Sequence, residues 1–274
     1  MRKLLAYPLT IIYFIFFGLT LVIFHPIQWV CYNVFGYKAH KISVDWLQFF
    51  LMRCLNLLGT TFTFNNTHQI PTDRPLIIVS NHQSMYDISP IMWYMRKHHV
   101  KFVAKKELAH GIPSVSYNLR HGGSVLIDRQ NPRQSLSVMM EFANYIEQTK
   151  RAAAIFPEGT RSKDGTPKPF KTRGLEILFK KTPSALIVPI TVNNSWKMLR
   201  YGKFPMGIGN HVKFKVHKPL ELVNFTDKIE LIQQIENTIV NSIENYFVNL
   251  ICYVVEKCKI RSDATSRKRC GCSY

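Results

Sequence analysis

Acidic side chains are scarce in this sequence of 274 residues, where 17 Asp and Glu stand against 36 Lys and Arg. The resulting formal charge of +19 indicates a polyanionic partner, either a nucleic acid or an anionic membrane face with a phosphorylated substrate. The sequence lacks a helix-turn-helix signature, a paired Cys/His finger and an RNP-type aromatic motif. We therefore expect no nucleic-acid partner.

Cysteine pairs at metal-binding or disulfide-framework spacing are also lacking. We interpret the thiols as reduced and facing the cytoplasm. Cys270 and Cys272 lie in a basic tail without a neighbouring His cluster, and they miss the prenylation position. No metal ligand set is visible, so we expect neither a metal nor a bound cofactor. The six cysteines are Cys31, Cys54, Cys252, Cys258, Cys270 and Cys272.

The N-terminal segment contains a long uncharged apolar run, Leu4 to Phe24. As a helix it would span roughly 31 Å, close to the thickness of a bilayer core. Arg2 and Lys3 precede it, which favours a cytoplasmic N-terminus, and no A-x-A cleavage site follows promptly. This pattern predicts a membrane anchor rather than a cleaved signal peptide.

A second apolar segment, Val44 to Leu58, carries polar interruptions and apolar residues at helical spacing. It predicts an amphipathic helix. This helix could lie on the bilayer, pair with the first helix and return the chain to the same side, or belong to a protein core.

The body of the chain alternates short apolar runs with helical patterns, which predicts an α/β domain with a central sheet. Helices are expected over 88–97, from the Asn131 cap onward, over 175–181 and after a capping box of Asp227 and Glu230. We divide the chain into anchoring helices (1–60), a catalytic domain (61–256) and a mobile basic tail (257–274). The expected strands are 76–80, 100–104, 124–127, 152–156, 186–192 and 211–216.

Apolar stripes on two of these helices predict the faces that pack on the sheet. We expect the methionines of the first stripe to be core residues rather than cofactor contacts. The first stripe is Leu136, Met139, Met140, Ala143 and Ile146, and the second is Ile232, Ile235, Ile239, Ile243, Phe247 and Leu250.

A histidine and an aspartate follow the first strand of the body at His82 and Asp87. Across a turn, the carboxylate can hold the imidazole tautomer and stabilise its protonated form, which frees the other ring nitrogen to take a proton from an alcohol. The spacing alone is a weak signal, because a His that bridges a turn gives the same pattern.

A second polar turn, Phe156–Ser162, also follows a strand directly. Gly159 allows a close backbone approach to a ligand. Arg161 offers a planar fork for phosphate oxygens, and Thr160 adds a hydroxyl. A polar loop with an Arg–Glu pair is the structural alternative.

More basic residues, including Lys105, Arg129 and Lys171, stand near the ends of apolar strands. A single Lys or Arg is usually a solvated surface residue. Several of them at strand ends, beside a His–Asp pair, predict a phosphate pocket next to a general base.

Four blocks in order resemble the glycerolipid acyltransferases, in particular the bacterial-type 1-acylglycerol-3-phosphate acyltransferases. Asn81–Asp87 looks like the family's NHxSxxD block and Phe156–Ser162 like its FPEGTRS block. Gly123–Arg129 is similar to its GxxxIDR block and Val188–Ile190 to its VPI block. The resemblance covers about Leu76 to Val192. It implies a central mixed sheet flanked by helices, with a membrane-associated helical segment at the N-terminus.

The resemblance also implies roles for the matching residues. His82 would be the general base and Asp87 its orienting partner. Lys105 and Lys171 would add positive charge to the site. The residues that would hold the phosphate and glycerol of the acceptor are Arg129, Glu158, Gly159, Thr160 and Arg161.

Our hypothesis is an acyltransferase at the cytoplasmic face of a membrane, with the bacterial inner membrane as the expected location. It would move a fatty acyl group from acyl-CoA or acyl-carrier protein to the sn-2 hydroxyl of lysophosphatidate. Three alternatives stay open: another lysophospholipid as acceptor, a non-catalytic module that binds anionic lipids, and a lipid-ester hydrolase with Ser84 as nucleophile.

Overall fold

The computed structural model describes residues 2–128 and 130–244. In this part of the chain a mixed sheet runs in the order β1-β7-β6-β2-β5-β3-β4, with β8 paired to β6. The β6–β7 and β6–β8 pairs are antiparallel and the other pairs are parallel. The strands are β1 (Thr61–Asn65), β2 (Leu76–Ser80), β3 (Lys101–Lys105), β4 (Val125–Ile127), β5 (Ala152–Ile155), β6 (Leu186–Asn193), β7 (His211–Val216) and β8 (Leu220–Glu221).

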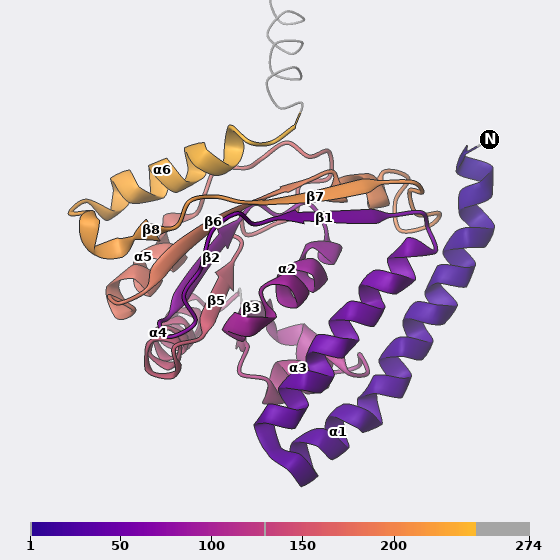
Figure 1. Cartoon of the computed structure of the whole chain (residues 1–274), viewed down its shortest axis with the longest axis horizontal. Helices are drawn as coiled ribbons and strands as arrows, with labels where there is room; N and C mark the ends of the chain where they lie inside the picture. The colour runs from indigo at the N-terminus through magenta and orange to yellow at the C-terminus, as the bar shows by residue number, and fades with distance from the viewer. Residues whose placement is uncertain (1, 129, 245–274) are drawn as a thin grey trace, which may run out of the picture.

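Helices cover both faces of the sheet (Figure 1). α4, α5 and α6 pack on one face, which buries Ile77, Val79 and Ile187. α1 and α2 pack on the other face, which buries Ile78 and Val188. The alternation follows from the period of two along a strand. These helices are α2 (Ile88–Tyr94), α3 (Val115–His121), α4 (Pro132–Thr149), α5 (Thr172–Lys181) and α6 (Lys228–Val240).

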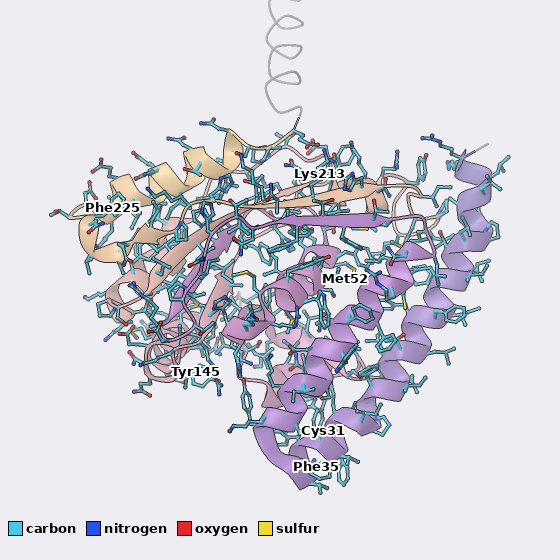
Figure 2. The ribbon with its side chains drawn as sticks, viewed as in Figure 1. Cys31, Phe35, Met52, Tyr145, Lys213 and Phe225 are labelled. Atoms are coloured by element: carbon cyan, nitrogen blue, oxygen red, sulfur yellow. The ribbon has the colours of Figure 1, made fainter. Side chains whose placement is uncertain are left out.

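The N-terminal helix α1 (Arg2–Asn56) is a hairpin of two legs that bends at Gly36, where φ is 77° and ψ is −170°. Such a positive φ suits glycine because it has no Cβ. Cys31 precedes the bend, Phe35 lies at it, and Met52 lies on the returning leg (Figure 2). The legs meet through Leu21, Leu47 and Leu51. Of the alternatives left open for the second segment, the structure shows pairing with the first helix, and the end of the returning leg also enters the core through Cys54 and Leu55. Both legs extend well beyond the predicted boundaries.

Most apolar side chains of the first leg face outward, and Leu4, Ile15 and Phe35 are more than half exposed. Among the described residues, α1 is long and apolar enough to cross a membrane by length and composition. This exposure differs from that of a helix buried in a protein core, whose apolar face is covered.

The six predicted strands form within a residue or two of their expected limits, and Asn131 caps α4 by accepting the Gln134 backbone N–H. The prediction for Met140 is wrong. Its side chain is exposed, and Phe142 takes a buried place on that helix. Asp227 caps α6 by accepting the N–H of Ile229. The sequence patterns missed β1, β8 and α3, which have only two to seven residues each.

Several predictions fall outside the described residues. They concern Arg129, Phe247, Leu250, four of the cysteines and the segment 257–274. The domain boundaries stay predictions. Cys31 and Cys54 are free thiols.

Candidate active site

The two polar turns singled out in the sequence lie at one edge of the sheet. β2 and β5 are neighbouring parallel strands, with Val79 opposite Ile155. The residues that follow them, His82 and the turn from Phe156, therefore leave the sheet side by side. In open α/β sheets ligands bind outside this carboxyl edge.

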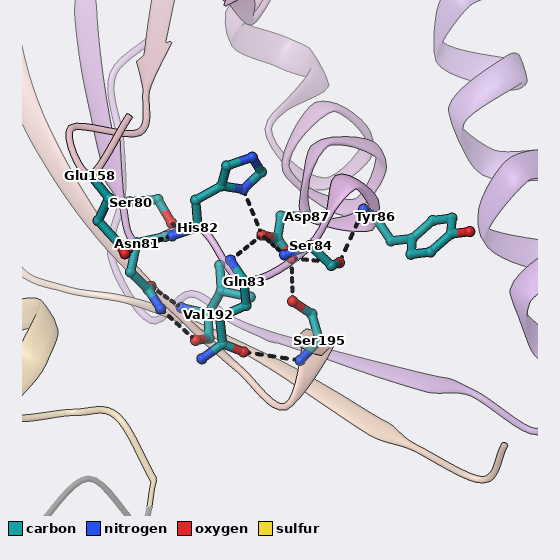
Figure 3. Close-up of polar contacts among 10 residues, drawn as sticks. All are labelled: Ser80, Asn81, His82, Gln83, Ser84, Tyr86, Asp87, Glu158, Val192 and Ser195. Carbon is teal, nitrogen blue, oxygen red and sulfur yellow. Dashed lines mark hydrogen bonds and ion pairs between the residues drawn. The ribbon is translucent and has the colours of Figure 1, made fainter. Parts of the chain in front are cut away.

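His82 and Asp87 form the pair that the spacing predicts. The Nδ1 atom of His82 is 2.9 Å from Oδ2 of Asp87 (Figure 3). A 3-10 turn over Met85–Asp87, capped by the Ser84 side chain, brings the carboxylate back towards the histidine. The other ring nitrogen, Nε2, points away from Asp87 and has no partner among the described residues. This is the arrangement that a general base requires.

The carboxylate of Asp87 is fully buried and held on both oxygens. Oδ2 also accepts the backbone N–H groups of Gln83 and Ser84, at 2.8 and 2.9 Å. Oδ1 accepts the hydroxyls of Ser84, at 3.3 Å, and Ser195. Charge-assisted hydrogen bonds of this kind fix a buried carboxylate in place. The position of the histidine ring is therefore set by a rigid partner.

The ring of His82 also stacks on Phe156, with ring centroids 4.0 Å apart and planes 13° from parallel. Its side chain keeps 13% of its surface exposed, while that of Asp87 keeps none. Only the outer part of the imidazole can thus meet a substrate.

The second turn is bonded directly to the backbone of His82. Oε1 of Glu158 accepts the His82 N–H at 2.7 Å, and the Ser162 N–H donates to the His82 carbonyl at 2.8 Å. Oε2 of Glu158 accepts the Lys168 N–H at 3.0 Å. Glu158 therefore braces both segments, and its direct contact with an acceptor stays a prediction.

Glu158 is 2% exposed. Burial raises the pKa of its carboxyl to about 7, although the two backbone N–H groups that it accepts oppose this shift. It does not pair with Arg161 among the described contacts, so the Arg–Glu alternative is not what forms this turn.

Thr160 and Arg161 are exposed and directly precede Ser162, whose N–H is bonded to His82. The Lys168 ammonium donates to the Thr160 hydroxyl at 2.9 Å and to the Arg161 carbonyl at 3.0 Å. Gly159 has φ 70°, and a Cβ there would stand 3.2 Å from Nζ of Lys171. Cationic side chains therefore gather at the turn whose backbone is bonded to His82.

Lys105 is the last residue of β3 and is exposed at the same carboxyl edge. Among the described residues, the structure therefore brings all the predicted site positions to one edge. Arg129 lies outside the described residues. No three His, Cys, Asp or Glu side chains of the described part lie close enough together to hold a metal ion.

Sequence reasoning missed Ser195 and Lys168, which bond the groups at the centre of the site. Ser195 follows β6, which is parallel to β2, so a polar residue after a strand was the available signal. Ser84, the nucleophile of the hydrolase alternative, is 0% exposed, and its hydroxyl accepts the Tyr86 N–H while it donates to Asp87. It lies too deep to attack an ester.

The fold and the site together define an α/β domain with a His–Asp pair at the carboxyl edge of its sheet, next to a cationic turn. Residues 61–193 match the model of the Acyltransferase family. The segment 61–193, just under half of the chain, is therefore similar to that family.

The names of curated relatives agree with the match to the family model. The chain is 35% identical over 153 residues to a chloroplastic 1-acyl-sn-glycerol-3-phosphate acyltransferase of Brassica napus. This matched region covers 54% of this chain and 42% of the relative. It is 36% identical to the enzyme of that name from Helicobacter pylori, over 46% of this chain and 54% of the relative. The chain thus spans about half the length of the curated relatives it matches.

A solved structure confirms the fold. The chain superposes on the 1-acyl-sn-glycerophosphate acyltransferase PlsC of Thermotoga maritima with a TM-score of 0.71 and 24% identity. The match covers 88% of this chain and 95% of that one. The expected central mixed sheet with flanking helices is therefore confirmed.

Proposed function

We propose that this protein transfers a fatty acyl group from a thioester, acyl-CoA or acyl-carrier protein, to the sn-2 hydroxyl of 1-acylglycerol-3-phosphate, giving phosphatidate. The proposal rests on one observation. The His82–Asp87 pair is bonded through the His82 backbone to the cationic turn 156–162. A proton acceptor and a phosphate-binding surface then stand at a fixed separation, which suits a phosphorylated alcohol.

The mechanism follows from the orientation of the ring. Nε2 of His82 takes the proton of the acceptor hydroxyl while the hydroxyl oxygen attacks the thioester carbonyl carbon. The tetrahedral intermediate collapses, the carbon–sulfur bond breaks, and the imidazolium returns its proton to the leaving thiolate. Asp87 keeps Nδ1 protonated and stabilises the imidazolium between these steps. The acceptor supplies the nucleophile, so no acyl-enzyme is needed.

Cationic groups of the turn would bind the phosphate of the acceptor. Arg161 is exposed and has no acidic partner among the described residues, so its guanidinium is available for phosphate oxygens. Arg129, Lys105 and Lys171 complete the proposed set. The outward apolar face of α1 would anchor the protein to the cytoplasmic face of a membrane, where the lipid acceptor would be presented.

A thiol-release assay tests the proposal, with acyl-CoA as donor in the presence and absence of lysophosphatidate. Release should depend on lysophosphatidate, and His82→Ala should lower turnover by about a hundredfold or more. Arg161→Ala should mainly raise the KM for the acceptor, whereas Lys163→Ala, which removes an exposed neighbouring cation, should not.

Each alternative gives a different result. Near-normal turnover of His82→Ala would refute the general-base role. Lipid binding without any thiol release would favour a non-catalytic module. Faster release with another lysophospholipid, in a panel of acceptors against one donor, would change the proposed substrate while keeping the mechanism.

A further inference from the structure

The bend of α1 lies against a basic cluster at the amino edge of the sheet. Lys101 begins β3 and Arg151 directly precedes β5, and these two strands are parallel neighbours. His82 follows the opposite, carboxyl end of β2. A strand of five residues is about 17 Å long, so the cluster is separate from the candidate active site.

A cavity of about 20 Å³ lies in this cluster, and we call it the bend cavity. It is enclosed by the start of the second leg of α1, the segment after α2, the start of β3 and the end of α3. Its volume gives room for about one water-sized particle. Tyr37, His40 and Lys101 are among its lining residues.

Two buried polar side chains face this cavity without protein partners. His40 is 0% exposed, and neither of its ring nitrogens has a hydrogen-bond partner in the described part of the chain. Lys101 is 6% exposed, and its Nζ lies 5.2 Å from the centroid of the Tyr37 ring, with no hydrogen bond to a described residue. Buried polar groups without partners are costly, and a buried charge more so. The two ring nitrogens of His40 therefore call for a ligand in the cavity, and the ammonium of Lys101, which lines the same cavity, gives that ligand a positive neighbour.

The charge around the cavity is strongly positive. Among the described residues that line it, Asp45 alone is acidic, and it is already paired with Lys41 at 2.5 Å. Arg96 also lines the cavity, and Arg151 stacks on the same Tyr37 ring at 4.2 Å. Burial, and then the nearby Arg151 and Lys41, lower the pKa of Lys101 to about 7, and the attraction of Asp45 opposes this shift only in part.

We propose that the bend cavity binds one chloride-sized inorganic anion, held by the ammonium of Lys101 and a ring N–H of His40. The small volume favours a monatomic anion over a phosphate. Because His40 lies on α1 just after the bend at Gly36 and Lys101 begins β3, the anion ties the bend of α1 to the amino edge of the sheet. The site therefore stabilises the docking of the hairpin and takes no part in acyl transfer.

Thermal unfolding of the full chain in detergent tests this site, with sodium chloride exchanged for sodium gluconate at constant ionic strength. Ionic screening is equal in the two salts because the ionic strength is constant. Gluconate is too large for the cavity, so a difference in Tm between the salts reports binding of chloride. Saturating chloride should raise the Tm by about 5 °C. The rise should persist in Lys218→Met, which removes an exposed lysine, and vanish in Lys101→Met.

Crystals grown in sodium bromide give a second, direct test on the unmodified protein, which decides the matter even if Lys101→Met does not fold. The expected result is an anomalous peak between Lys101 and His40. Equal Tm values in chloride and gluconate, an equal rise in all three proteins, or a cavity without an anomalous peak would each overturn the proposal.

Discussion

Replacement of Asp87 by Asn tests the proposed mechanism most sharply, because it removes one negative charge and almost no volume. The Asp87 carboxylate lies 2.9 Å from Nδ1 of His82 and is fully buried. Its role is to hold the ring and to balance the positive charge that His82 acquires during transfer. The two roles separate in this variant, since an amide can hold the ring but carries no charge.

The fold should survive the change. The amide oxygen can occupy the Oδ2 position and accept from His82 and from the N–H groups of Gln83 and Ser84. The amide NH₂ then faces the hydroxyls of Ser84 and Ser195, which can rotate to accept. Charge-assisted bonds become neutral ones, so the free energy of unfolding should fall by about 1–3 kcal/mol.

Turnover should fall much further than stability. A pair of opposite charges about 4 Å apart is worth about 4 kcal/mol at an effective dielectric constant of about 20. Losing that stabilisation of the imidazolium corresponds to about a thousandfold in kcat. Thiol release at saturating acceptor measures this effect, and Asp73→Asn, at an exposed position, is the matched control.

A double-mutant cycle decides whether Asp87 acts through His82. If it does, adding Asp87→Asn to His82→Ala should lower turnover little further, because the charge to be balanced no longer forms. Fully additive losses, or an Asp87→Asn protein that is folded and keeps its kcat, would refute the reasoning.

Two further predictions concern the groups that support the pair. Ser195→Ala removes a hydroxyl donor from the buried Asp87 carboxylate, so it should lower the free energy of unfolding by about 1–3 kcal/mol. It should also lower kcat and leave the acceptor KM unchanged. The control is Ser137→Ala at an exposed position, and equal behaviour of the two variants would contradict this prediction. Burial raises the pKa of Glu158 from 4.5 to about 7, so its contribution to stability is full below about pH 4.5 and is lost as the pH rises through 7. This contribution is about 3 kcal/mol, and urea unfolding should show that the wild type loses it relative to Glu158→Gln across that range, whereas a constant difference would exclude the shift.

The centre of the site was predictable because its determinants are local. The approach of Asp87 to His82 depends on one short turn, and the residues of that turn are contiguous in the sequence. The meeting of the two turns is not local, because it requires β2 and β5 to be parallel neighbours, and the resemblance of both blocks to one family pointed to it. The role of Ser195 could not be read in the same way. It depends on β6 lying beside β2, and the order of strands in a sheet is a tertiary property.

The limits of the hairpin were mispredicted for another reason. Between the two predicted helices, polar residues such as His25, Lys38 and Lys41 interrupt the apolar pattern. The helix still continues through them: the Ser114 N–H of the body donates to His25, and Lys41 pairs with Asp45 one turn further along the same helix. Tertiary contacts thus overrule the local pattern at the bend.

His82 connects the His–Asp pair to the proposed phosphate-binding turn. Its side chain bonds Asp87, its N–H bonds Glu158, and its carbonyl accepts the Ser162 N–H. Backbone bonds of this kind leave far less freedom than two long side chains would, so the distance from the base to the phosphate-binding turn is nearly fixed. An acceptor whose hydroxyl and phosphate stand further apart than in glycerol-3-phosphate can satisfy one part of the site only by leaving the other. The selectivity that we propose therefore arises from the connection between the two turns, and weakening the Glu158 brace should relax it.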